Sequence, residues 1–106
     1  MIYEIREYTA VPGRMHALIR RNREVGIPLF AKHGMECVFM SVTEIGDNGN
    51  NELVYVLKWD SYAQMAEKWA AYLTDPDWLE AKAASEADGP IVERIRRRIA
   101  NPAPFL

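Results

Sequence analysis

The chain has 106 residues, of which 49% are hydrophobic and 26% charged, and its formal net charge is −2. This composition is typical of a globular protein, and the length predicts one domain over residues 1–106. The charge balance argues against a nucleic-acid partner. No stretch reaches the roughly 18 apolar residues that a membrane-spanning helix needs. Charges stand where a signal peptide would be apolar, so we expect a cytoplasmic protein.

Residues 2–9 are rich in β-branched and aromatic side chains, which predicts a strand. The segment Val11-Pro12-Gly13 then predicts a turn. Side chains alternate along a strand, so Glu4, Arg6 and Tyr8 share one face.

From Arg14 onward, apolar residues recur at helical spacing: Met15, Leu18, Ile19, Val25 and Leu29. Gly26 and Pro28 interrupt this helix, because proline lacks the N–H donor and clashes with the preceding turn. We therefore expect a kink or a restart there. Gly34 predicts the end of the helix, because glycine readily adopts the left-handed cap conformation.

Residues 35–46 and 52–59 read as two strands, and residues 47–51 between them are all turn formers. This pattern predicts a β-hairpin with a short polar loop. A helix capped by Asp60 or Ser61 follows, with a broad apolar stripe. Asp75-Pro76 then breaks the chain and begins another short helix.

The last segment, residues 91–99, fits a helical period, and strand alternation fits it less cleanly. Gly89-Pro90 and residues 101–104 bound a piece of strand length, and we predict a strand. Alternation would place four residues together on one face: Val92, Arg94, Arg96 and Arg98.

The order strand–helix–hairpin–helix–strand predicts an α+β, ferredoxin-like βαββαβ fold. Its four-stranded antiparallel sheet carries the helices on one face. The strands contribute apolar side chains to both faces, so the other face also needs a cover. A second copy related by a two-fold axis is the simplest cover, and we expect a homodimer through the sheet face.

Five segments support a family resemblance, in order along nearly the whole chain: residues 2–14, His33-Gly34, residues 59–62, residues 75–78 and residues 102–105. Together they resemble the NIPSNAP family. This resemblance implies a dimeric α/β barrel, in which two ferredoxin-like sheets face each other. It implies no catalytic residues, because the family has none that can be carried over.

The candidate site is the polar row Glu4, Arg6 and Tyr8, which the packing argument places on the face that a second copy would enclose. The first and last strands are neighbours in this topology, so we expect Arg94 and Arg96 beside Glu4 and Arg6. Such a cluster suits an anionic or polar aromatic ligand, with Tyr8 as a donor to an oxyanion and Glu4 as a base. A cross-strand salt-bridge ladder is the favoured alternative.

Other residues with reactive or aromatic side chains have simpler explanations. His33 is predicted to lie in the last helical turn, with an acid–base role as the alternative. Cys37 is predicted to be an ordinary core thiol. Trp59 and Trp69 either fill the core or line a pocket, and Trp59, at a strand end, joins the candidate ligand-binding residues. The two histidines lack metal-ligand spacing, and we expect neither a metal nor a cofactor.

Three functions fit these observations. The first is a NIPSNAP-like dimer of uncharacterised activity that binds a small polar or aromatic ligand between the sheet and the helices. The alternative is a cofactor-independent monooxygenase or isomerase acting on a small aromatic or enolisable compound, an analogy from architecture alone. The third is a purely structural dimer without a pocket.

Overall fold

The computed structural model describes residues 1–105 of the chain. The elements follow in the order β1 (Ile2–Ala10), α1 (Met15–Arg21), a π-helix η1 (Asn22–Gly26), α2 (Ile27–Lys32), β2 (Glu36–Val42), β3 (Glu52–Trp59), α3 (Tyr62–Leu73), α4 (Pro76–Ser85) and β4 (Val92–Ala100). No helix in the described part of the chain is long and apolar enough to cross a membrane.

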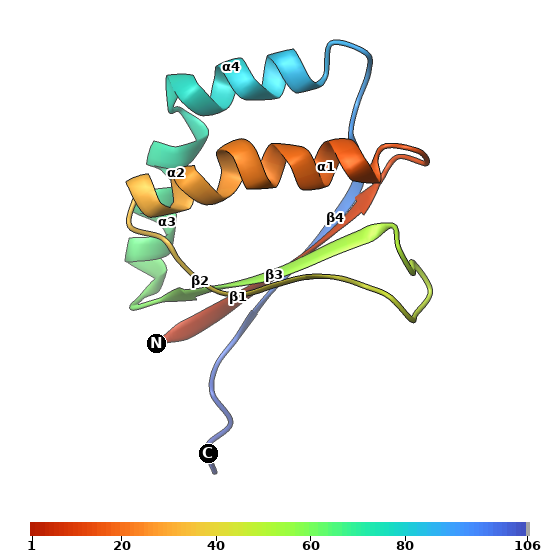
Figure 1. Cartoon of the computed structure of the whole chain (residues 1–106). Coiled ribbons are helices and arrows are strands. Elements are labelled where there is room, and N and C mark those ends of the chain that lie inside the picture. The colour runs from red at the N-terminus through yellow and green to blue at the C-terminus, as the bar shows by residue number, and fades with distance from the viewer. Residues whose placement is uncertain (106) are drawn as a thin grey trace.

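The four strands form one antiparallel sheet in the order β2-β3-β1-β4. Figure 1 shows all helices on one side of this sheet, with α1 and α2 running across it and α4 beyond them. No helix of residues 1–105 lies on the opposite face (Figure 1). This is the ferredoxin-like α+β fold predicted from the sequence, including β4 as a strand beside β1.

The helix boundaries follow local chemistry. The Ser61 hydroxyl accepts a hydrogen bond from the backbone N–H of Gln64 and so caps α3. The Asp75 carboxylate accepts one from Asp77 N–H at the start of α4. Gly34, just after α2, has φ +65°. These caps confirm Ser61, Asp75 and Gly34 as the boundary residues expected from the sequence.

The expected interruption of the first helical segment takes the form of the π-helix η1. The backbone N–H of Ile27 reaches back to the Asn22 carbonyl, one residue further than in an α-helix. Pro28 follows in the first turn of α2, where its missing N–H is tolerated. One extra residue is therefore accommodated in this turn.

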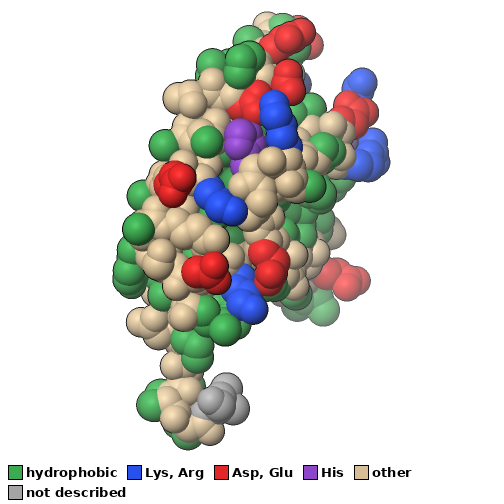
Figure 2. Space-filling model, turned by 90° about the vertical axis from the view of Figure 1, so that its left-hand side faces the viewer, with side chains coloured by type: hydrophobic (Ala, Val, Ile, Leu, Met, Phe, Trp, Pro, Cys, Tyr) green, Lys and Arg blue, Asp and Glu red, His purple; other side chains and the backbone are tan. Residues whose placement is uncertain are grey.

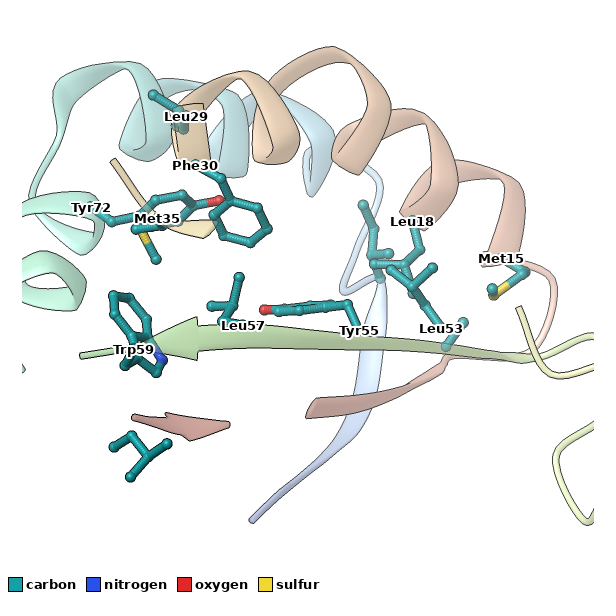
Figure 3. Close-up of a cluster of buried hydrophobic side chains, with 13 residues drawn as sticks. Met15, Leu18, Leu29, Phe30, Met35, Leu53, Tyr55, Leu57, Trp59 and Tyr72 are labelled. Atoms are coloured by element: carbon teal, nitrogen blue, oxygen red, sulfur yellow. The ribbon is translucent and has the colours of Figure 1, made fainter. Parts of the chain in front are cut away.

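Figure 3 shows Tyr55, Leu57 and Trp59 rising from β3 toward Phe30 and Tyr72 of the helices. On β1, the residues of this core-facing side are Ile2, Glu4, Arg6, Tyr8 and Ala10. The prediction that the polar row lies on the face opposite the helices is therefore wrong. The row faces α3, because Leu57, Tyr55 and Leu53 on β3 carry the core and are paired with Glu4, Arg6 and Tyr8.

The placement of Arg94 and Arg96 beside Glu4 and Arg6 is also wrong. Arg97 pairs with Arg6, whereas Arg96 pairs with Glu7 on the opposite face. Packing of Ile99 against the core sets this register, and a shift of one residue would expose it. A bulge near the start of β4 reverses the alternation, so Val92 shares the helix-facing side with Ile95 and is separated from Arg94, Arg96 and Arg98.

Candidate functional site

The Glu4 carboxylate is fully buried at the centre of the helix-facing side. Its Oε1 accepts hydrogen bonds from the indole nitrogens of Trp59 (3.0 Å) and Trp69 (2.7 Å). Its Oε2 accepts from Arg6 Nη1 at 3.0 Å and from Arg97 Nε. A buried carboxylate tolerates its ionised form only with such compensation, and here both oxygens carry two donors.

These contacts decide the protonation state of Glu4. Burial alone would raise the pKa of this carboxyl, but the four hydrogen bonds outweigh burial and hold the pKa below its ordinary value. An ionised carboxylate whose oxygens are all engaged has no free lone pair directed at a ligand. The structure therefore favours a structural role for Glu4 over the base expected as one possibility from the sequence.

A chain of donors leads from Glu4 to two tyrosines. Arg6 Nε donates to the Tyr8 hydroxyl at 2.9 Å, and the Tyr8 and Tyr55 hydroxyls lie 2.8 Å apart. The Arg6 guanidinium also lies 4.6 Å from the centroid of the Trp69 ring. Burial is the main cause that raises the pKa of Tyr55 well above its usual value, so this phenol stays protonated.

Beside this chain lies a cavity of about 460 Å³ between the sheet and the helices. Its aromatic lining consists of Tyr8, Phe30, Tyr55, Trp69, Tyr72 and Trp78. Ring centroids 5.2 to 5.6 Å apart connect Tyr72 with its neighbours Trp69, Phe30 and Trp78. This volume lies within the range of ~300–1,000 Å³ typical of small-molecule sites, which are mostly apolar with a few directed polar groups.

The polar groups of the cavity come from several elements. Its basic residues are Arg6, Arg21, Lys82 and Arg94, and its acidic residues are Glu86 and Glu93. The hydroxyl of Tyr72 makes no hydrogen bond within residues 1–105, although the residue is only 5% exposed. Asn22 and Gly26 of the π-helix also line the cavity. A cavity with this lining can hold a ring and a polar or anionic substituent together.

Gly26 of the π-helix lies at the wall of this cavity. A Cβ atom at Gly26 would lie 3.0 Å from Asn22 Oδ1 and 3.6 Å from the Tyr72 hydroxyl. A glycine there keeps the helix close to the aromatic wall without filling the cavity. Irregular π turns occur often at functional sites, and this one supplies two lining residues.

The remaining candidates from the sequence lie outside the cavity or at its edge. Trp59 is 1% exposed, and its indole nitrogen donates its hydrogen bond to Glu4. Arg96 contacts Glu7 at 3.7 Å on the far side of the sheet, whereas Arg94 belongs to the cavity lining. The His33 Nε2 atom lies 2.7 Å from Asp75 Oδ2 and joins the end of α2 to the start of α4. No metal-binding group of three or more His, Cys, Asp or Glu residues occurs in the described part of the chain.

Two important residues, Arg21 and Arg97, were not among the candidates from the sequence. Arg21 follows Leu18 by three positions and precedes Val25 by four, which places it on the apolar stripe of its helix. That spacing is a usable signal, because an arginine on such a stripe is buried. Arg97 shares a strand face with Ile95 and Ile99, and their apolar character is the corresponding signal.

Figure 2 shows the side of the molecule near the helix ends, where acidic and basic side chains are interspersed. Where α2 ends and α4 begins, Lys32, His33 and Asp75 form one group of charges, with Lys32 Nζ 2.8 Å from Asp75 Oδ2. Charges of both signs alternate in this view, and they form no single-sign surface for a polyanion (Figure 2).

Several solved structures are similar to this protein over nearly the whole length of the chain. A NIPSNAP family protein with unknown function from Agrobacterium tumefaciens is 31% identical, with a TM-score of 0.84 over 100% of this chain and 91% of its own. A second NIPSNAP family protein from that organism is 24% identical, with a TM-score of 0.84 over 98% of this chain and 94% of its own. An antibiotic biosynthesis monooxygenase shares only the fold, at 10% identity and a TM-score of 0.65, over 98% of this chain and 100% of its own.

No curated protein matches the sequence. The model of the NIPSNAP family matches residues 3–106, which is nearly the entire chain. That match agrees with the segments from which the resemblance was inferred, at both ends of the chain and at the helix boundaries between them. The chain belongs to the NIPSNAP family.

Proposed function

We propose that the protein binds a small polar or aromatic molecule in the cavity between the sheet and the helices. The observation that carries this proposal is the combination of an aromatic lining with polar groups that have spare hydrogen-bonding capacity. The Tyr72 hydroxyl and the Arg21 guanidinium are the main examples, and both residues are more than nine-tenths buried. Arg21 Nε is buried and has no hydrogen-bond partner within residues 1–105, and buried polar atoms of this kind are uncommon in folded proteins.

Binding is better supported than turnover. Glu4, the base expected as one possibility from the sequence, already accepts four hydrogen bonds and has no free lone pair to take a proton. The monooxygenase fold similarity extends to the backbone only, and one fold hosts many activities. Tyr8 and Tyr55 remain hydrogen-bonding groups for a ligand in this proposal.

Ligand-observed NMR with a mixture of small polar aromatic compounds tests the proposal. Trp78→Leu removes one wall of the cavity and should abolish or weaken binding by about tenfold, the effect of losing about 1.4 kcal/mol of contact energy. Tyr62→Leu is the control, because Tyr62 is an exposed aromatic residue on α3 outside the cavity. Equal binding by both variants, or no binding by the wild-type protein, would contradict the proposal.

We also propose that a second copy of the chain covers the open face of the sheet. One row across this face runs from Phe39 through Val56 and Ile5 to Arg98, and Phe39 is 52% exposed. The next row ends in Glu7 and Arg96, which contact each other. An apolar centre with charges of both signs at its edge is self-complementary, as a two-fold interface requires.

Light scattering after gel filtration tests the dimer. The expected species has twice the chain mass of 12.2 kDa. Val56→Glu places a carboxylate in the apolar row and should shift the protein to the monomer, because an unpaired charge is poorly tolerated inside an interface. Ile45→Glu is the control, since Ile45 is a 93% exposed loop residue. A wild-type monomer at micromolar concentration would refute the dimer.

A cytoplasmic location is likewise a proposal. Cys37 is the single cysteine, and it is a free thiol. Small domains that function outside the cell are usually stabilised by disulfides, so a lone thiol supports a reducing compartment. Fractionation of cells that produce the untagged protein would test this location.

A further inference from the structure

Arg21 is the least well paired buried charge of the cavity. Its side chain is 7% exposed. Nη1 donates to the Ser85 hydroxyl at 3.3 Å and lies 3.9 Å from Glu86 Oε1, which is too long for a hydrogen bond. Its Nε atom is buried and has no hydrogen-bond partner within residues 1–105.

This situation is energetically unfavourable for a guanidinium. Burial is the main cause that lowers the pKa of Arg21, and attraction to Glu86 offsets it only partly. The ordinary pKa of arginine is so high that the group nevertheless remains charged at neutral pH. The Arg21 guanidinium therefore has N–H donors that could bind an additional acceptor. A planar anion offers two oxygens to such a group.

The surroundings of Arg21 determine what else the ligand contains. The guanidinium lies 5.2 Å from the centroid of the Trp78 ring, and Trp78 in turn is 5.6 Å from Tyr72. The Tyr72 hydroxyl, without a partner in the described chain, opens on the same cavity. Lys82 adds a second cation from α4, and Glu86 is the acidic residue nearest to Arg21.

We propose that the ligand is an aromatic carboxylate whose anionic group binds Arg21 and whose ring packs against Trp78 and Tyr72. This inference rests on the proposed ligand-binding function and specifies its chemical class. An aromatic ring that carries a carboxylate matches this arrangement of one guanidinium beside two aromatic rings. Glu86 competes for Arg21 in the empty cavity and is displaced when the carboxylate binds.

The test compares naphthoate with its neutral counterpart naphthamide by isothermal titration calorimetry. The two probes have nearly the same shape and differ in charge. The wild-type protein should bind naphthoate about tenfold to a hundredfold more tightly, the range expected for a hydrogen bond that gains a charged partner. Arg21→Met should remove this preference while leaving the affinity for naphthamide within about threefold. Arg21→Lys should retain part of it, because lysine keeps the charge without the planar fork.

A second variant, Glu86→Gln, should change the affinity for naphthoate in the opposite direction from Arg21→Met. Glu86→Gln removes the competing carboxylate and should tighten naphthoate binding severalfold, an effect that damage to the fold would not produce. The exposed pair Arg20 and Glu24 is the control, since it is an arginine–glutamate pair, 3.3 Å apart, on the helix surface outside the cavity. Arg20→Met and Glu24→Gln should leave both affinities unchanged.

The outcomes separate the two proposals. Equal affinity of the wild-type protein for both probes, or equal weakening of both by Arg21→Met, overturns the aromatic carboxylate and leaves ligand binding in the cavity standing. A failure of Glu86→Gln to tighten naphthoate binding also overturns the role of Arg21. If neither probe binds to the wild-type protein, both the ligand class and the binding function are contradicted.

Discussion

Two buried charges of this molecule differ in how completely they are paired. Glu4 is 0% exposed and accepts hydrogen bonds from two indoles and two guanidiniums. Arg21 is 8% exposed and has one long hydrogen bond and one distant carboxylate. Both lie between the sheet and the helices, so burial alone does not distinguish them.

Their difference separates structure from function. A fully hydrogen-bonded ion is part of the core, because removing it leaves several partners unsatisfied. An incompletely paired ion beside a cavity has capacity for a ligand. Glu4 therefore organises the strands and α3, whereas Arg21 is available for recognition.

The largest expected effect comes from removing the paired charge. Glu4→Ala leaves the Arg6 and Arg97 guanidiniums without their acceptor and should lower the free energy of unfolding by about 3–5 kcal/mol. Urea denaturation followed by circular dichroism measures this loss. Glu24→Ala, at an exposed ion pair, should change stability by at most about 0.5 kcal/mol. Similar losses for both variants would mean that the Glu4 contacts contribute no special stability.

The pairing of carboxylates also predicts how the fold responds to acid. Hydrogen bonds from Lys32, Asp77 N–H and His33 lower the pKa of Asp75 from 3.8 to about 2. A carboxyl with a depressed pKa in the folded state stabilises the fold above pH 3.8, and this contribution is lost as the pH falls toward 2. Asp75→Asn keeps an acceptor for the helix cap and removes the charge. We expect its stability to depend less on pH between these values, as measured by thermal unfolding. An unchanged pH dependence would exclude Asp75 as a contributor.

The hydroxyls of Tyr55 and Tyr72 also differ in hydrogen bonding, and the expected effects on stability are smaller. The Tyr55 hydroxyl is hydrogen-bonded to Tyr8, so Tyr55→Phe should lower the free energy of unfolding by about 1 kcal/mol. The Tyr72 hydroxyl has no partner in residues 1–105, so Tyr72→Phe should leave stability nearly unchanged. Chemical denaturation of the two variants in parallel decides this. A larger loss for Tyr72→Phe would reverse the assignment of paired and unpaired groups.

A small effect on stability is also expected for Arg21→Met in the absence of ligand. An imperfectly paired buried charge contributes little, so stability should stay within about 1 kcal/mol of the wild-type value in either direction. Differential scanning calorimetry provides the measurement. A loss as large as that of Glu4→Ala would show that Arg21 is a structural residue.

The fold was largely predictable because its signals are local. The turn formers of residues 47–51 predict the hairpin, and Ser61, Asp75 and Gly34 predict helix ends by cap chemistry. The polar row Glu4, Arg6 and Tyr8 was recognised from strand alternation alone.

The site was predictable only in part, because its geometry depends on irregular turns and on register. The bulge at the start of β4 reverses the alternation, and packing of Ile99 then brings Arg97 beside Glu4 in place of Arg94 and Arg96. The π turn supplies Asn22 and Gly26 to the cavity lining, and no residue pattern identifies such a turn in advance. Which face of the sheet meets the helices is decided by tertiary packing, and the sequence favoured the other face for the polar row.

The π turn at residues 22–26 has a consequence for how this chain tolerates changes of length. Deleting one residue within it would restore an uninterrupted α-helix from α1 to α2 without loss of backbone hydrogen bonding. Because the turn absorbs the extra residue, α1 and α2 would keep the same faces toward the sheet, and the change would be confined to the turn residues Asn22 and Gly26 that line the cavity. The loss of a single codon would therefore alter the binding pocket of a protein that keeps its fold.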